Sequence, residues 1–160
     1  MFRPLVAIAA ITLPIASIGA ATPMSGSAYV TKAGASDQYE IQSSRLVMGT
    51  SNAQLKQFAN QMVTDHTKST ADVKAAAARA GVKVAPPKLE PMQAKMIADL
   101  RKVSGPARDR LYVTQQKKSH QMALALHKGY STDGRSAPLK EVASNITPVV
   151  QSHIDMLAGM

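Results

Sequence analysis

Two histidines fall where helical spacing would otherwise place apolar residues. Side chains three, four, seven or eight positions apart share one face of an α-helix. His66 follows Met62 by four residues, and His153 follows Val150 by three and precedes Leu157 by four. Both imidazoles are therefore predicted to face the interior of a helical domain, where each needs a hydrogen-bond partner or a metal ion.

Two further polar groups occupy comparable positions. His120 follows Tyr112 by eight residues and precedes Leu124 by four, which places it at least on the edge of an apolar face. Glu40 shares its face with Ser44, and that face is only moderately apolar. Together with the two histidines above, these residues would give each of four long helices one inward polar group.

One carboxylate and three imidazoles form a ligand set that suits zinc, iron, manganese or copper. Helical bundles build metal sites in this way, from side chains on facing helices. Asp65 and Asp155 lie close in sequence to two of the histidines and could orient them as outer partners. The same groups could instead hydrogen-bond one another and fix the helix register without a metal. The candidate ligands are Glu40, His66, His120 and His153.

Methionine and the fourth histidine offer two further possibilities. Met62 precedes His66 by four residues and Met156 follows His153 by three, and thioether with imidazole suits copper. Helical methionine more often fills a core. His127, beside a lysine near the expected end of its helix, is predicted to interact with terminal carbonyl groups.

The sequence carries no recognisable catalytic motif. It has no cysteine, no nucleophile elbow, no glycine-rich phosphate loop and no HExxH pair. It also lacks the Glu-x-x-His pairs of di-iron bundles, so an oxidoreductase is the least favoured reading. These patterns favour a binding protein over an enzyme.

The candidate ligands can meet only if the segments that carry them are helices packed together. Apolar residues recur at spacings of three and four, and no segment alternates with period two, so the sequence predicts an all-α fold. Four long helices would form a ferritin-like antiparallel bundle, with one short extra helix. Residues 36–158 are the expected domain, capped at Ser36 or Asp37, and 21–35 a flexible leader. The predicted helices cover residues 37–48, 52–80, 90–103, 107–128 and 138–157.

The first twenty residues read as a cleavable signal peptide. Arg3 supplies the positive start, residues 5–18 an apolar stretch, and Gly19 to Ala21 small residues for cleavage after Ala20 or Ala21. An uncleaved anchor is the alternative. A lipid attachment site is not expected without cysteine, and the mature protein is expected to lack a membrane span. The protein is therefore expected in the periplasm or cell envelope of a bacterium.

Positive charge is concentrated in the middle of the chain. The net charge is +9, and between Lys68 and Lys128 thirteen Lys and Arg face four Asp and Glu. Such a surface would attract an anionic lipid or polysaccharide of the envelope, or simply keep the protein dissolved. Export and the scarcity of aromatic residues argue against nucleic acid. The alternative function is thus a structural or stress-related envelope protein, and its oligomeric state stays open.

Several of these positions resemble a known family. The block QMVTDHTK at 61–68 resembles the Asp-His signature of the secreted bacterial family DUF4142, whose members are often labelled predicted outer membrane proteins. Glu40-Ile41, Phe58-Ala59, Asp109 with Tyr112 and His120, and residues 153–157 match the family's order along the chain. The resemblance covers about residues 36–157.

This resemblance implies a ferritin-like four-helix bundle but supplies no activity. It implies that Glu40, His66, His120 and His153 are the residues of interest. Two positions depart from the family pattern: Arg108 stands where a phenylalanine is usual, and Ser119 where an acid often precedes the histidine of that helix. The second departure removes a possible carboxylate and argues against a two-metal site. Helical spacing alone indicates the same four residues.

Overall fold

The computed structural model describes residues 23–160, so the signal-peptide prediction over 1–20 lies outside the described residues. Five helices and no strand make up this part of the chain, which confirms the all-α fold. Within it, no helix combines the length and the apolarity needed to cross a membrane. The helices are α1 (Gly26–Val47), α2 (Ala53–Arg79), α3 (Pro91–Lys102), α4 (Gly105–Asp133) and α5 (Ala137–Ala158).

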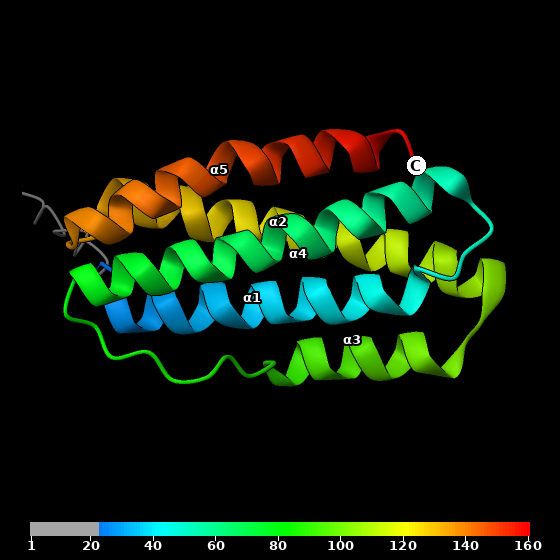
Figure 1. Cartoon of the computed structure of the whole chain (residues 1–160), viewed down its shortest axis with the longest axis horizontal. Coiled ribbons are helices and arrows are strands. Elements are labelled where there is room, and N and C mark those ends of the chain that lie inside the picture. The colour runs from blue at the N-terminus through cyan, green and yellow to red at the C-terminus, as the bar shows by residue number, and fades with distance from the viewer. Residues whose placement is uncertain (1–22) are drawn as a thin grey trace, which may run out of the picture.

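Four of the helices form an antiparallel bundle (Figure 1). The α1–α2 and α4–α5 hairpins pack side by side, so that α1 also contacts α4 and α2 also contacts α5. The connection from α2 to α4 returns along the length of the bundle and includes α3, which lies against α1 and α4. One long crossover between two helical hairpins is the ferritin-like arrangement.

The first helix begins eleven residues earlier than the sequence predicted. Ser25 is its N-cap and accepts a hydrogen bond from the backbone N–H of Ala28 at 3.2 Å. Ser36 and Asp37 are therefore interior positions, and the expected flexible leader is wrong from Gly26 onward. The small residues that suggested a leader instead permit close packing. A Cβ on Gly34 would lie 3.3 Å from the ring of Pro87, in the α2–α3 connector.

The fourth helix also extends further than predicted. It continues through Gly129 to Asp133, where the sequence predicted a loop from 129 to 137. Tyr130 explains the extension, because its buried ring stacks on Tyr29 with the ring centres 4.1 Å apart. This tertiary contact outweighs the modest helix-breaking tendency of a single exposed glycine.

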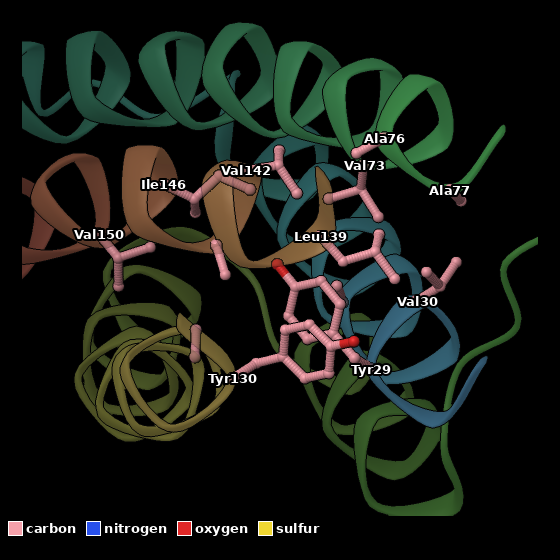
Figure 2. Packing of buried hydrophobic residues seen from close by; sticks show 13 residues of the cluster. Tyr29, Val30, Val73, Ala76, Ala77, Tyr130, Leu139, Val142, Ile146 and Val150 are labelled. Atoms are coloured by element: carbon pink, nitrogen blue, oxygen red, sulfur yellow. The ribbon is translucent and has the colours of Figure 1, made fainter. Parts of the chain in front are cut away.

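The core is divided into two apolar clusters at opposite ends of the bundle. Figure 2 shows the first, where Tyr29 and Tyr130 pack beside aliphatic residues of α2 and α5 such as Val73 and Leu139. The second cluster contains Leu55, Phe58, Met62, Leu100, Tyr112 and Leu157. Between them lies a layer of buried polar side chains that includes Asp37, Glu40, His66, Gln116, His120 and His153. This layer is where the sequence placed the candidate site.

Candidate metal centre

Three of the four predicted ligands meet in the middle of the bundle. His66 comes from α2, His120 from α4 and His153 from α5. Each is at most 4% exposed, and one ring nitrogen of each lies within 4.8 Å of one ring nitrogen of the other two. The ring centres are 5.4–5.8 Å apart and the rings are tilted rather than stacked. We call these residues the histidine triad.

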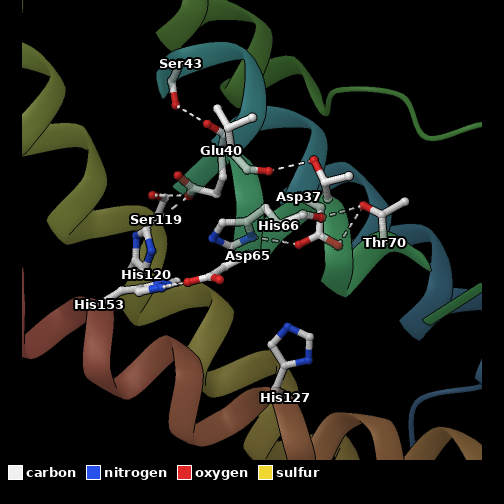
Figure 3. A network of polar contacts seen from close by, with 12 residues as sticks. Asp37, Glu40, Ser43, Asp65, His66, Thr70, Ser119, His120, His127 and His153 are labelled. Carbon is white, nitrogen blue, oxygen red and sulfur yellow. Dashed lines mark hydrogen bonds and ion pairs between the residues drawn. The ribbon is translucent and has the colours of Figure 1, made fainter. Parts of the chain in front are cut away.

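Each ring of the triad has one nitrogen held from outside it (Figure 3). Nδ1 of His66 lies 2.8 Å from Oδ1 of Asp37, and Nε2 of His153 lies 2.9 Å from Oδ2 of Asp65. Nδ1 of His120 lies 3.0 Å from the carbonyl oxygen of Gln116. Since a carbonyl oxygen can only accept, His120 must carry its proton on Nδ1.

Within residues 23–160, the opposite nitrogens have no hydrogen-bond partner. They are Nε2 of His66, Nε2 of His120 and Nδ1 of His153, all buried. An imidazole whose one nitrogen donates to a carboxylate or a carbonyl, and whose other nitrogen is free, is arranged as in a metal-binding histidine. Each of the three neighbouring rings of the triad therefore has one buried nitrogen available to a ligand.

Glu40 lies beside the triad without joining it. Its Oε1 accepts a hydrogen bond from Ser119 at 2.7 Å and lies 3.8 Å from Nδ1 of His120. Its Oε2 is buried and without a partner. The three mutually close ligand atoms are all imidazole nitrogens. The structure thus brings together the predicted histidines and leaves the predicted carboxylate as a neighbour.

Asp37 is the functional candidate that the sequence analysis missed. It is 2% exposed and contacts two α2 residues, His66 and Thr70, whose hydroxyl donates to Oδ2 at 3.0 Å. From the sequence, Asp37 was predicted to be a helix cap. Its position three residues before Glu40 was the available signal, because residues at that spacing share a helix face.

The two proposed outer partners have different outcomes. Asp65 contacts a triad member, but this is His153 on another helix rather than its sequence neighbour His66. Asp155 is exposed and accepts a hydrogen bond from Gln151 at 2.9 Å. Its predicted role beside the triad has no support in these contacts.

His127 lies apart from the triad, and its predicted place at a helix end is wrong (Figure 3). Because α4 continues to Asp133, His127 is an interior position of the helix and only 2% exposed. Its Nδ1 lies 3.0 Å from the hydroxyl of Tyr29. Burial lowers the pKa of His127 to about 4, although the charge of Asp37 opposes this change.

The surroundings act differently on the three triad members. Burial lowers the pKa of His120 against the opposing charge of Glu40. Burial also lowers the pKa of His153, to about 4, despite the hydrogen bond to Asp65. For His66, burial alone would lower the pKa, but the hydrogen bond and charge of Asp37 reverse this and raise it above 6.5. His120 and His153, whose pKa values are lowered, can coordinate a metal as neutral rings at neutral pH, whereas metal binding to His66 must compete more strongly with a proton.

A ladder of side-chain hydrogen bonds joins α1 to α4 around this layer. Besides the Ser119–Glu40 contact, it contains three pairs: Ser44–Tyr112 at 2.8 Å, Gln116–Ser43 at 3.0 Å and Tyr39–Gln115 at 3.1 Å. These bonds fix the relative height of two helices that carry Glu40 and His120. The sequence analysis did not predict this ladder.

The fold and these contacts define a class of domain: a ferritin-like helical bundle with three histidines gathered in its interior. The chain matches the family described as Domain of unknown function (DUF4142) over residues 14–160 and belongs to that family. The resemblance drawn from the sequence is thereby confirmed.

A solved structure supports the fold. A DUF305 fragment from Deinococcus radiodurans is similar to this chain with a TM-score of 0.70 and 15% sequence identity. The match covers 84% of this chain and 93% of that one. No curated protein matches the chain.

The two departures from the family pattern both make specific contacts. Arg108 donates from Nε to the carbonyls of Leu100 and Val103 and from Nη1 to the carbonyl of Leu46. Arg108 thus satisfies carbonyl oxygens at the ends of α1 and α3 that have no hydrogen-bond partner within their own helices. Ser119 binds Glu40, as described above. A hydroxyl there orients a carboxyl group without adding a second one.

Proposed function

We propose that this protein is an exported cell-envelope protein that binds one transition-metal ion through His66, His120 and His153. The observation that carries the proposal is the pairing of every triad imidazole: one nitrogen held by an oxygen acceptor, the other buried and free. A structural histidine usually satisfies both of its nitrogens. One cation can instead satisfy a free nitrogen on each of three neighbouring rings.

The neighbouring carboxyl groups support a cation at this position. Asp37 and Glu40 are both at most 2% exposed, and a buried carboxylate requires a positive partner. Among the ion pairs of residues 23–160, these two groups face only histidines and neither lysine nor arginine. A divalent ion at the triad would supply positive charge close to both.

The triad requires only a small adjustment to coordinate a metal. Metal–nitrogen bonds of about 2.0–2.1 Å in a tetrahedral centre place ligand nitrogens roughly 3.3 Å apart. The triad nitrogens lie within 4.8 Å of one another, so the distances between them must shorten by up to about 1.5 Å. Three imidazoles leave a fourth position, which Glu40 or water can take. Imidazole ligands suit zinc and copper best, and they also bind iron.

The test is elemental analysis and metal titration of protein purified without a histidine tag. The proposal expects one zinc, copper or cobalt ion per chain, lost in His66→Ala, His120→Ala and His153→Ala. The matched control is His127→Gln, which alters a buried histidine outside the triad. Binding that is substoichiometric, or equally weak in the triad variants and the wild type, overturns the proposal.

A second function, binding to an anionic envelope component, is favoured by the distribution of charge. The excess of basic residues lies between Lys68 and Lys128, and many of these side chains, such as Lys74 and Lys117, are exposed. Cosedimentation with vesicles containing phosphatidylglycerol tests it. Binding that falls with salt and is indifferent to chelator supports this function, and absence of binding at low salt rules it out.

A further inference from the structure

A pocket between α2 and α5 leads from the surface to the triad. It has a volume of about 130 Å³, and two triad members, His66 and His153, form part of its wall. His120 is fully buried and does not line it. The triad is therefore enclosed on the α4 side and reached from outside between α2 and α5.

The inner part of the pocket carries three polar residues, Ser69, His66 and His153, among aliphatic side chains, and each of the three has a polar atom that lacks a hydrogen-bond partner within residues 23–160. Ser69 is 8% exposed, and its hydroxyl is buried without a hydrogen-bond partner. The free nitrogens of His66 and His153 belong to the same lining residues. Buried polar atoms without partners need water or a ligand, because their desolvation is otherwise uncompensated. This wall suits a hydrated cation that exchanges water for imidazole.

The outer wall of the pocket carries acidic and amide oxygens. Asp65 and Asp72 are partly exposed two turns apart on α2, and Asn145 is exposed on α5. Lys68 also lines the pocket, but it is paired with Asp72. With two carboxyl groups and one lysine, this opening carries one net negative charge, on a chain whose net charge is +9. Oxygen ligands at a mouth attract a cation and steer it inward.

We propose that this pocket is the entrance through which a divalent cation reaches the histidine triad, with Asp65 and Asp72 guiding it. The inference rests on the proposed metal-binding function. Asp65 connects the mouth to the centre, because the carboxyl group that lines the pocket also holds Nε2 of His153. A rival route exists at a groove of about 260 Å³ between α1, α3 and α4, which Ser119 and Met122 line. Ser119 in that groove donates a hydrogen bond to Glu40, but neither Glu40 nor a histidine lines the groove.

The experiment compares rates of Co(II) uptake and release for variants that obstruct one route each. Val149 lines the α2–α5 pocket and Met122 the rival groove, and both are large, exposed apolar residues, 41% and 48% exposed. Val149→Trp should slow uptake and release together by about tenfold, with stoichiometry and affinity unchanged, because a route alters rates and not the end states. Met122→Trp should leave both rates within about twofold of the wild type.

A charge variant gives an independent test that leaves packing intact. Asp72→Asn should reduce the uptake rate by about threefold to tenfold at low salt and weaken its dependence on ionic strength. Unchanged rates in both Val149→Trp and Asp72→Asn, or slowing by Met122→Trp alone, would overturn the entrance while leaving the metal site standing. Failure of the wild type to bind Co(II) at all would overturn the proposed function, and the entrance with it.

Discussion

At the scale of single residues, the triad depends on groups that hold each imidazole from outside. Asp37 is one of these groups, because its carboxyl group lies 2.8 Å from Nδ1 of His66 and raises the pKa of that ring. Outer partners of this kind commonly contribute about 10–100-fold to metal affinity. Asp37→Asn should therefore lower both the pKa of His66 and the affinity for Zn(II).

Nuclear magnetic resonance titration of the histidine rings and competition with a chromophoric chelator measure these two effects. Asp155→Asn is the control, since that carboxyl group is exposed and bonded to Gln151. An unchanged pKa of His66 in Asp37→Asn would show that this contact does not set its protonation.

His127 predicts a dependence of stability on pH that is separate from the triad. Its pKa is about 4 in the folded protein and about 6.5 when unfolded. Between these values the unfolded state binds more protons, so stability is fully present above pH 6.5 and lost as the pH falls towards 4. His127→Gln keeps a neutral side chain beside Tyr29 and should reduce this loss by about 2–3 kcal/mol.

Denaturant unfolding at pH 7 and pH 4.5 checks this expectation. His127→Gln should have the shallower pH dependence, whatever its stability at pH 7. If the variant and the wild type lose the same free energy of unfolding between pH 7 and pH 4.5, His127 must be protonated in the folded state as readily as in the unfolded state.

At the scale of helices, the ladder of side-chain hydrogen bonds between α1 and α4 fixes the position of one helix along the other. Tyr112 and Ser44 are fully buried and bonded at 2.8 Å. Tyr112→Phe leaves the hydroxyl of Ser44 without this partner and should cost about 1–3 kcal/mol. The double variant Ser44→Ala with Tyr112→Phe should be more stable than the sum of the two single losses predicts. Thermal or urea unfolding of all four proteins gives the coupling energy, and strict additivity would contradict a bonded pair.

How far the sequence predicts these elements depends on what each helix packs against. For α2, an apolar stripe and clear end signals predicted residues 52–80, within one residue of the observed bounds. For α1, the first turns bury Ala33, Gly34 and Ala35, and small residues give no strong apolar stripe. The start of this helix was therefore missed, as was the end of α4, which the Tyr29–Tyr130 stack decides.

The same distinction applies to the site. The inward faces of the triad histidines follow from helical spacing, and their meeting follows from the bundle. The group that holds the other nitrogen of each ring does not follow from spacing. Contacts such as that of His153 with Asp65 join residues 88 positions apart. The α1–α4 ladder and the role of Asp37 depend on helix register, which periodicity within one helix cannot supply.

At the scale of the whole molecule, the bundle places a polar layer between two apolar clusters. Such a layer stabilises a fold less than apolar packing does unless its charges and free nitrogens are satisfied. A metal that binds only the folded state supplies this satisfaction and adds stability. At 100 times the dissociation constant the gain is about 2.7 kcal/mol, which for a domain of this size raises Tm by about 10 °C.

Thermal unfolding with Zn(II), with and without a chelator, therefore separates the two readings of the buried layer. If the layer is a metal site, chelator should lower Tm of the loaded protein by about 10 °C and have no effect on His120→Ala. His127→Gln should respond to chelator as the wild type does. If the layer is only a hydrogen-bonded network, Asp37 and the raised pKa of His66 already balance its charge, and Tm should be indifferent to both metal and chelator.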